Sequence, residues 1–529
     1  MTLWRNGSLS RPSPEAYLAG AVLAAGLVGL CLLIHPYEGI IHDARLYVGQ
    51  VLAAADPGGV GQDFMFTNDG QFGFTVFPHF ITAAIDMFGV AQGAKLVSLA
   101  GLLLWIGALV SLAAAMAKGR LRWVIVLFVL VLPASYGGFH VFHYAEPMAV
   151  PRTFPEAAVL FAFALMCRGR RLAALVPLAA AALFHPIMAL PGLGVWTWLT
   201  FFDPEERVFS LPVSLACAGG AVALLLLAAA FHVPVADRLF VTIDPAFGEM
   251  ISARTPDLLP VQWPAQDWSR LLVQFATLAI ATRVVSGRLR SLFIATMVIG
   301  VVGLAAAHFF GSVFGSLLAV QVQSWRSVWI VAVLAAAALA ICSVQLWRQG
   351  GNARLTLGWL VIAWLGAETI PIALSAAGLA FILAFWRPAQ TRRIDPKLTF
   401  ALWGFVGCYA LLTFGIRLYG VAAFSADAPD GSWNIVSLLS MFGVWSMPVC
   451  ALAAVYALTK PSERLLLPLS AAAVVLAVLG VVLWDVRDAR TVEADTAAGD
   501  PALRALLSSR PGAVLWLDGR FDTWSLAGR

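Results

Sequence analysis

Long apolar runs alternate with short polar segments over most of the chain. A helix rises about 1.5 Å per residue, so about 20 apolar residues can cross a hydrocarbon core of about 30 Å. No alternating ten-residue pattern typical of an outer-membrane barrel is visible. The pattern predicts helices over fifteen segments: 16–34, 93–117, 121–137, 154–167, 172–185, 188–202, 208–231, 268–282, 291–309, 326–347, 355–368, 371–386, 398–416, 435–458 and 464–484.

Composition supports a membrane protein. The 529 residues are 60% hydrophobic and 12% charged, whereas soluble domains are about 25% charged. The mean hydropathy is +0.85. The first run, 16–34, is long for a cleaved signal peptide and is expected to be retained. All six cysteines lie in or beside apolar runs, so no disulfide is expected.

Basic residues predict the orientation. With the N-terminus cytoplasmic, 20 of the 34 lysines and arginines fall in cytoplasmic segments. Merging 172–202 and 355–386 into single helices gives thirteen spans, and it places the basic segment "RVVSGRLR" outside. We therefore keep the breaks at "HPIMALPG" and "ETIPIA". The predicted fold class is an all-α polytopic protein of the inner (plasma) membrane with 13 to 15 transmembrane helices and a functional face toward the periplasm or outside.

The two long outside loops are predicted to be ordered. Loop 35–92 carries an amphipathic surface helix over Asp43–Ala55 and a second one over Thr75–Phe88 that Pro78 interrupts. The proline-rich loop 232–267 is typical of an irregular cap over a cavity. Both loops belong to a predicted membrane domain that spans residues 1–484.

Residues 485–529 form a short outside tail with a predicted α/β character. Asp500 and Pro501 are typical of the first positions of a helix. Two strand-like runs follow, on either side of a hairpin turn at Asp518 and Gly519. A segment of this size is too small for an independent domain. It is expected to pack on the membrane domain or to be part of a larger domain.

Asp43 is the most informative polar residue. It follows the first apolar run in "HPYEGIIHDARLYVGQ" and directly precedes a predicted helix. Aspartate is a favoured helix N-cap, which is one explanation of its position. The other is chemical, because a carboxylate at the start of a large outside loop can act as a base at the membrane surface.

Three motifs resemble the GT-C superfamily of integral-membrane glycosyltransferases. They are "YEGIIHDARLYVGQ", "FHVFHYAEPMAVPRTFPEA" and "LFHPIMALPG", within residues 1 to about 190. The resemblance implies transfer of a sugar, expected to be inverting, from a polyprenyl-phosphate donor to a glycan, lipid or protein acceptor in envelope polysaccharide biosynthesis. It also implies that Asp43 is the catalytic base. Members often carry a second acid beside the first, where this chain has Ala44 and Arg45.

Such a reaction requires cations that bind the leaving phosphate, and arginine does so with two parallel hydrogen bonds. The candidates are Arg326, Arg417 and Arg152. Snorkelling at the interface is the alternative for the first two, and an ion pair with Glu156 is the alternative for Arg152. Other residues expected to line the cavity are His42, Tyr47, Glu146, His143, His185 and Glu156. His140, His143 and Glu146 could bind a divalent metal, although isolated polar histidines are the simpler interpretation.

Two other functions fit the same pattern. A transporter or a lipid or polysaccharide flippase also has many spans and few intramembrane charges, but it is expected to show two similar halves. A non-catalytic partner in polysaccharide export is the third candidate. The net charge of +5 is explained by topology, so no nucleic-acid partner is expected.

Overall fold

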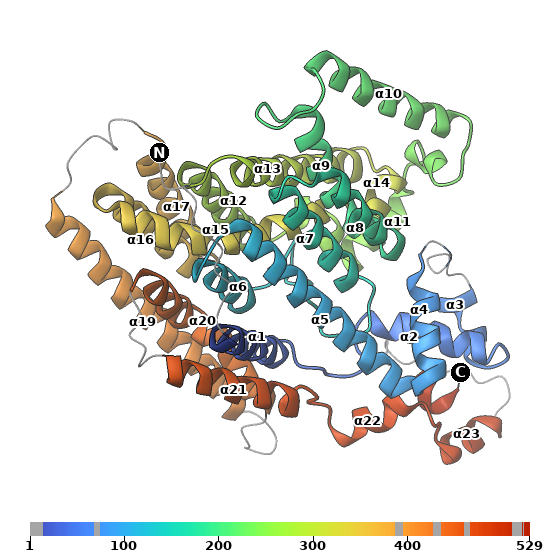
Figure 1. Ribbon diagram of the computed structural model, residues 1–529. Helices are drawn as coiled ribbons and strands as arrows, with labels where there is room; N and C mark the ends of the chain where they lie inside the picture. The colour runs from blue at the N-terminus through green and yellow to red at the C-terminus, as the bar shows by residue number, and fades with distance from the viewer. Residues whose placement is uncertain are drawn as a thin grey trace.

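The computed structural model describes residues 14–67, 73, 75–386, 395–426, 435–459, 466–509, 521 and 523–528. Within these ranges the chain is mainly helical, with short turns and loops between the helices and one antiparallel hairpin, β1 (Ser135–Tyr136) paired with β2 (Phe142–His143). Figure 1 shows the long helices in one bundle, with the short helices of the first loop and of the tail together at one end of it.

Each of the fifteen predicted apolar segments contains a helix. These helices are α1 (Pro14–Ile34), α5 (Val90–Met116), α6 (Leu121–Val131), α7 (Thr153–Cys167), α8 (Arg171–Phe184), α9 (Pro186–Thr197), α10 (Leu211–Ala230), α12 (Ala265–Val284), α13 (Arg288–Ala306), α15 (Val328–Gln349), α16 (Gly351–Leu365), α17 (Ile370–Phe385), α19 (Pro396–Ala426), α20 (Ile435–Leu458) and α21 (Leu466–Leu483). The helix breaks predicted at "HPIMALPG" and "ETIPIA" are present, at His185 and at 366–369.

The helices support a membrane protein. Five described segments are long and apolar enough to cross a membrane, and eight other described helices are apolar but shorter. The five are Val90–Met116, Leu211–Ala230, Arg288–Val313, Leu317–Gln349 and Pro396–Gly420. The number of spans and their orientation remain predictions.

Helix α15 lies at the centre of the bundle. Nearly all its residues from Val328 to Val344 are buried, and α6, α12 and α16 pack around it. Its run of alanines lets neighbouring helices approach closely, as in other helical membrane proteins. Helix α10 is mostly exposed and stands apart from the bundle in Figure 1.

Helices α1 and α21, from opposite ends of the sequence, pack closely against each other. A Cβ atom added at Gly29 would clash with the backbone of Leu476, and one added at Gly480 would clash with the backbone of Gly29. Only glycine permits this backbone contact. The ends of both helices therefore lie beside the first loop.

The first loop contains α2 (Ala44–Ala55), the 3₁₀ turn η1 (Val60–Gln62), α3 (Phe64–Thr67) and α4 (Phe77–Phe88). The predicted helix after Asp43 is confirmed. The expectation that Pro78 interrupts the second helix is wrong, because Pro78 lies in the first turn of α4. A proline there loses no intrahelical hydrogen bond.

Short helical turns make up the segment predicted as a cap. They are η4 (Ala236–Leu239), α11 (Pro245–Arg254), η5 (Pro256–Leu258) and η6 (Pro260–Gln262). After α9, the chain forms the π-helical turn η3 (Trp198–Phe202). Between α13 and α15 it forms η7 (Ala307–Val313), α14 (Leu317–Val322) and η8 (Ser324–Ser327).

The tail packs on the first loop. Backbone hydrogen bonds join Tyr37 N to Trp484 O at 2.7 Å and Val486 N to Tyr37 O at 3.0 Å. The Asp495 carboxylate accepts from Ile40 N at 3.2 Å, and Arg487 contacts both Asp485 and Asp495. These contacts hold the chain segment that leads directly into Asp43.

The described part of the tail is helical. It contains α22 (Ala489–Thr496), α23 (Pro501–Ser508) and the π-helical turn η10 (Thr523–Ala527). Asp500 caps α23 through hydrogen bonds from Ala502 N and Leu503 N, as predicted. The strand predicted to follow Asp518 and Gly519 is wrong over η10, whereas residues 510–520 lie outside the described part. Trp524 of η10 donates to Asp63 of the first loop at 2.9 Å.

The predicted orientation can be tested by cysteine labelling. In a variant without the six native cysteines, Ser286→Cys in "RVVSGRLR" should react only with reagent on the cytoplasmic side. Ala253→Cys in α11 should react only from outside, because the positive-inside bias separates these segments. Both positions are exposed. The reverse labelling pattern would support the thirteen-span arrangement.

Candidate functional site

Asp43 occupies the sharp turn between α1 and α2. The preceding residue, His42, has a left-handed backbone (φ 49°), which is rare outside glycine. The distance from His42 Nδ1 to Asp43 Oδ1 is 3.3 Å. The Asp43 side chain makes no capping hydrogen bond to α2, although it is at the N-cap position. Asp43 therefore takes the predicted N-cap position, but its carboxylate contacts His42 and Arg152 instead of capping the helix.

Arg152 connects Asp43 to a second carboxylate. It lies at the start of α7 and is 3% exposed. Its Nη1 forms a short ion pair with Asp43 Oδ2. Its Nε and Nη2 donate to Glu146 Oε2 at 2.7 Å and 2.5 Å. The predicted pair between Arg152 and Glu156 does not form.

The charges around Asp43 keep it ionised. Burial raises the pKa of its carboxyl, but the hydrogen bond with His42 and the charge of Arg152 lower it by more. The net pKa is well below the usual range of aspartate. The same hydrogen bond raises the pKa of His42. The Asp43 side chain is 32% exposed, so an incoming molecule can reach this carboxylate.

Arg326 is a second buried cation close to this network. It is 7% exposed, and its guanidinium carbon lies 4.1 Å from the centre of the Phe142 ring. Arg152 contacts the same ring, at 5.3 Å. Arg326 Nε donates to Gln323 Oε1 at 2.6 Å, and Nη1 contacts Met188 Sδ at 4.0 Å. Within the described ranges Arg326 forms no ion pair, and its two Nη atoms donate to no oxygen.

Backbone conformation brings these groups together. Gln323 has φ 47°, which ends α14 and starts the turn that carries Arg326. On the β2 side, Ala145 has φ 57°, and its N–H donates to Glu156 Oε2 at 2.9 Å. Glu156 therefore supports the turn that presents Glu146. Its Oε1 is buried without a hydrogen-bond partner among the described atoms.

Asp257 is a site residue that sequence reasoning missed. It lies in η5 of the cap, is 8% exposed, and interacts electrostatically with Arg326, Asp43 and His42. Burial raises the pKa of its carboxyl. Trp263 donates to the backbone oxygen of Asp257 and packs against Trp325, 5.4 Å away, beside Arg326. An acid within the predicted cap was the only sequence signal for this placement.

A second polar cluster surrounds His140. Its Nε2 lies 3.2 Å from Glu368 Oε1, and its Nδ1 lies 3.7 Å from Asp267 Oδ1. Arg270 bonds Asp267 at 2.8 Å. A pocket of about 430 Å³ next to this cluster is lined by Arg270, Glu368 and Arg417. Arg417 therefore lines this pocket, and the contacts found for Asp43 do not include it.

The remaining predicted residues are divided between these sites. His143 interacts electrostatically with both His42 and His140, so it lies between the two clusters. His185 Nδ1 accepts a hydrogen bond from Met188 N at 3.4 Å at the start of α9. Tyr47 packs edge-on against Phe77, 5.1 Å away.

The structure does not bring the three predicted metal ligands together. His140 faces Glu368 and Asp267, whereas Glu146 faces Arg152. In the part of the chain that is described, no group of three or more His, Cys, Asp or Glu side chains is placed to hold a metal ion. Two of the three suggested donors, His140 and Glu146, thus contact other charged side chains.

Comparison of the chain with known protein families, with curated proteins and with solved structures gives no match.

Proposed function

We propose that this protein is a membrane glycosyltransferase that uses a lipid-phosphate-linked sugar. The observation that carries the proposal is Arg326. Burying a guanidinium is costly unless an anion compensates its charge. Arg326 lacks an ion-paired carboxylate among the described residues, and it lies close enough to Asp43 for the two charges to interact. A phosphate bound at Arg326 would supply the missing hydrogen-bond acceptors.

In the proposed reaction, Arg326 binds the donor phosphate and the acceptor hydroxyl approaches Asp43. The new bond forms between the acceptor oxygen and the anomeric carbon as the bond from that carbon to the phosphate oxygen breaks. The acceptor proton passes to Asp43, and the lipid phosphate leaves bound to Arg326. The low pKa of Asp43 suits a late proton transfer, because the hydroxyl becomes acidic only as it bonds to an oxocarbenium-like carbon.

Other residues orient this pair. His42 contacts one carboxylate oxygen of Asp43 and Arg152 contacts the other, so the orientation of the carboxylate is held. Glu146 compensates the charge of Arg152, which leaves Arg326 as the cation available to the donor.

Replacement of Arg326 tests donor binding. Arg326→Ala should weaken binding of a polyprenyl-phosphate sugar by about tenfold to a hundredfold, the loss of a charge-assisted hydrogen bond worth about 1.5–3 kcal/mol. Arg326→Lys should also weaken binding, because lysine keeps the charge but loses the planar fork. The measurement is titration of the purified protein with the donor in detergent.

Arg238→Lys is the matched control, since Arg238 lies on the cap and donates to Gln321 at its exposed surface. Thermal unfolding of each variant separates loss of binding from loss of fold. Wild-type binding by both Arg326→Ala and Arg326→Lys would overturn the assignment of Arg326 as the donor contact. Movement of the donor lipid across vesicles without a new glycosidic bond would instead support the flippase alternative.

A further inference from the structure

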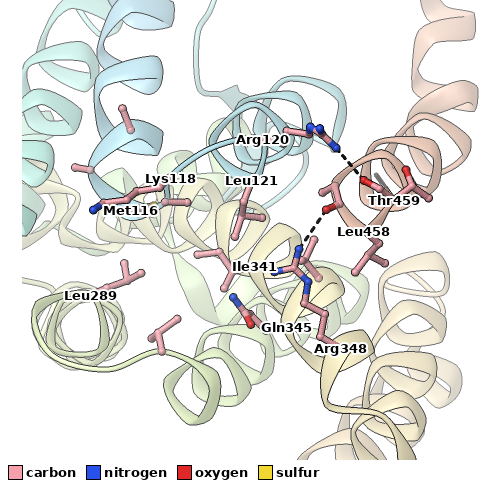
Figure 2. Close-up of a pocket in the computed structure, with 16 residues that line it drawn as sticks. Met116, Lys118, Arg120, Leu121, Leu289, Ile341, Gln345, Arg348, Leu458 and Thr459 are labelled. Atoms are coloured by element: carbon pink, nitrogen blue, oxygen red, sulfur yellow. Dashed lines mark hydrogen bonds between the residues drawn. The ribbon is translucent and has the colours of Figure 1, made fainter. Parts of the chain in front are cut away.

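A pocket of about 680 Å³ opens at the end of the bundle opposite Asp43. Figure 2 shows its lining residues, which come from the end of α5, the start of α6, the junction of α12 and α13, the C-terminal part of α15 and the end of α20. Arg326 directly precedes α15, whereas Arg348 lies in its last turn. A helix of 22 residues is about 33 Å long, so this pocket is separate from the candidate catalytic site.

The rim of the pocket is cationic. Arg120 and Arg348 line it together with Lys118, and none of the described lining residues is acidic. Arg120 Nη1 donates to Thr459 O at 2.8 Å, and Arg348 Nη2 donates to Ala457 O at 3.3 Å. These carbonyls lie at the end of α20. Neither arginine forms an ion pair with a carboxylate in the described ranges, so both charges are left for an external anion.

The floor of the pocket is apolar. Its lining includes the buried Ile341 and Val344 of α15 and the half-buried Leu121 and Leu289. Ile341 and Arg348 are seven residues apart on α15, which corresponds to about 10 Å along the helix. A ligand with an anionic head and a hydrocarbon tail satisfies both parts of the pocket. A small hydrophilic anion would leave the apolar floor uncovered.

We propose that this pocket binds the headgroup of an anionic phospholipid, with an acyl chain along the apolar floor. The positive-inside bias places this end of the bundle at the cytoplasmic leaflet, where anionic headgroups meet basic pockets between helices. The bound lipid would bridge α5, α15 and α20. The proposal is independent of the glycosyltransferase assignment, because the two sites share no lining residue.

The test is lipid binding to the purified full-length protein, measured by native mass spectrometry. Phosphatidylglycerol should bind more tightly than phosphatidylcholine with identical acyl chains. Each cation near a membrane surface contributes about 1 kcal/mol, so Arg120→Gln and Arg348→Gln should each weaken phosphatidylglycerol binding roughly fivefold. Arg120→Lys and Arg348→Lys keep the charge, and they should retain the preference.

Arg122→Gln is the matched control, because Arg122 is exposed at the same end of the bundle and lies over the Trp123 ring, outside the pocket. It should bind phosphatidylglycerol as the wild type does. Equal binding of both lipids, or an equal loss in Arg122→Gln, would overturn the proposal. Displacement of the lipid by millimolar glycerol phosphate would also overturn it, since the pocket would then be a site for a soluble phosphate.

Discussion

Asp43→Asn should lower sugar transfer by about two to four orders of magnitude while the protein folds normally. Asparagine retains an oxygen that accepts from His42 or Arg152, and Arg152 keeps both hydrogen bonds to Glu146. The amide cannot take up the acceptor proton. The measurement is transfer of radiolabelled sugar from a polyprenyl-phosphate donor in membranes that contain equal amounts of each variant.

Asp56→Asn provides the control for this loss. Asp56 belongs to the same loop and accepts from Gly59 N at 3.0 Å, away from the Arg152 network. Its replacement should leave transfer unchanged. Wild-type transfer by Asp43→Asn, together with an unchanged melting temperature, would show that Asp43 is a structural partner of Arg152 and would remove the proposed base.

Arg152→Met should destabilise the protein by about 3–5 kcal/mol, which is typical when one partner of a buried ion pair is removed. Glu146 is 4% exposed and would lose the guanidinium that accounts for its only side-chain ion pair in the described structure. Asp43 would lose the same partner. Thermal unfolding in detergent should show this as a large fall in melting temperature.

The double variant Arg152→Met/Glu146→Gln separates charge from packing. It removes both buried charges, so it should recover part of the stability lost in the single variant. Arg45→Met is the control, because Arg45 contacts only the His42 carbonyl among the hydrogen bonds described. If Arg152→Met lowers the melting temperature no more than Arg45→Met does, the network contributes little to the stability of the fold.

Hydropathy was sufficient to predict the helices because burial in lipid or protein requires long apolar segments. The breaks at His185 and near Thr369 were also predictable, since proline cannot continue the preceding hydrogen-bond pattern. The tail was not. "DTWSL" has β-type residues, but Trp524 packs in a helical turn on the first loop, and such long-range contacts override a weak local preference.

The candidate site shows the same division. Asp43 could be identified from its position after the first helix, and Arg326 from the polar residues before it. The carboxylate that pairs with Arg152 could not be predicted, because Glu146 and Glu156 are both close to it along the chain. A left-handed residue at Ala145 decides which of them faces the arginine. Asp257 depends on how the cap folds over the bundle, and no local pattern encodes that placement.

The attachment of the tail to the first loop has a consequence for biogenesis. Ile40 and its hydrogen-bond partner Asp495 are 455 residues apart. At about 5–20 residues per second, a ribosome needs about 20–90 s to synthesise the intervening chain. During that interval Tyr37 and Ile40 lack the partners that hold the segment before Asp43. A nascent chain therefore inserts most of its helices before this segment is secured, and premature termination would leave the acid-bearing loop without its support.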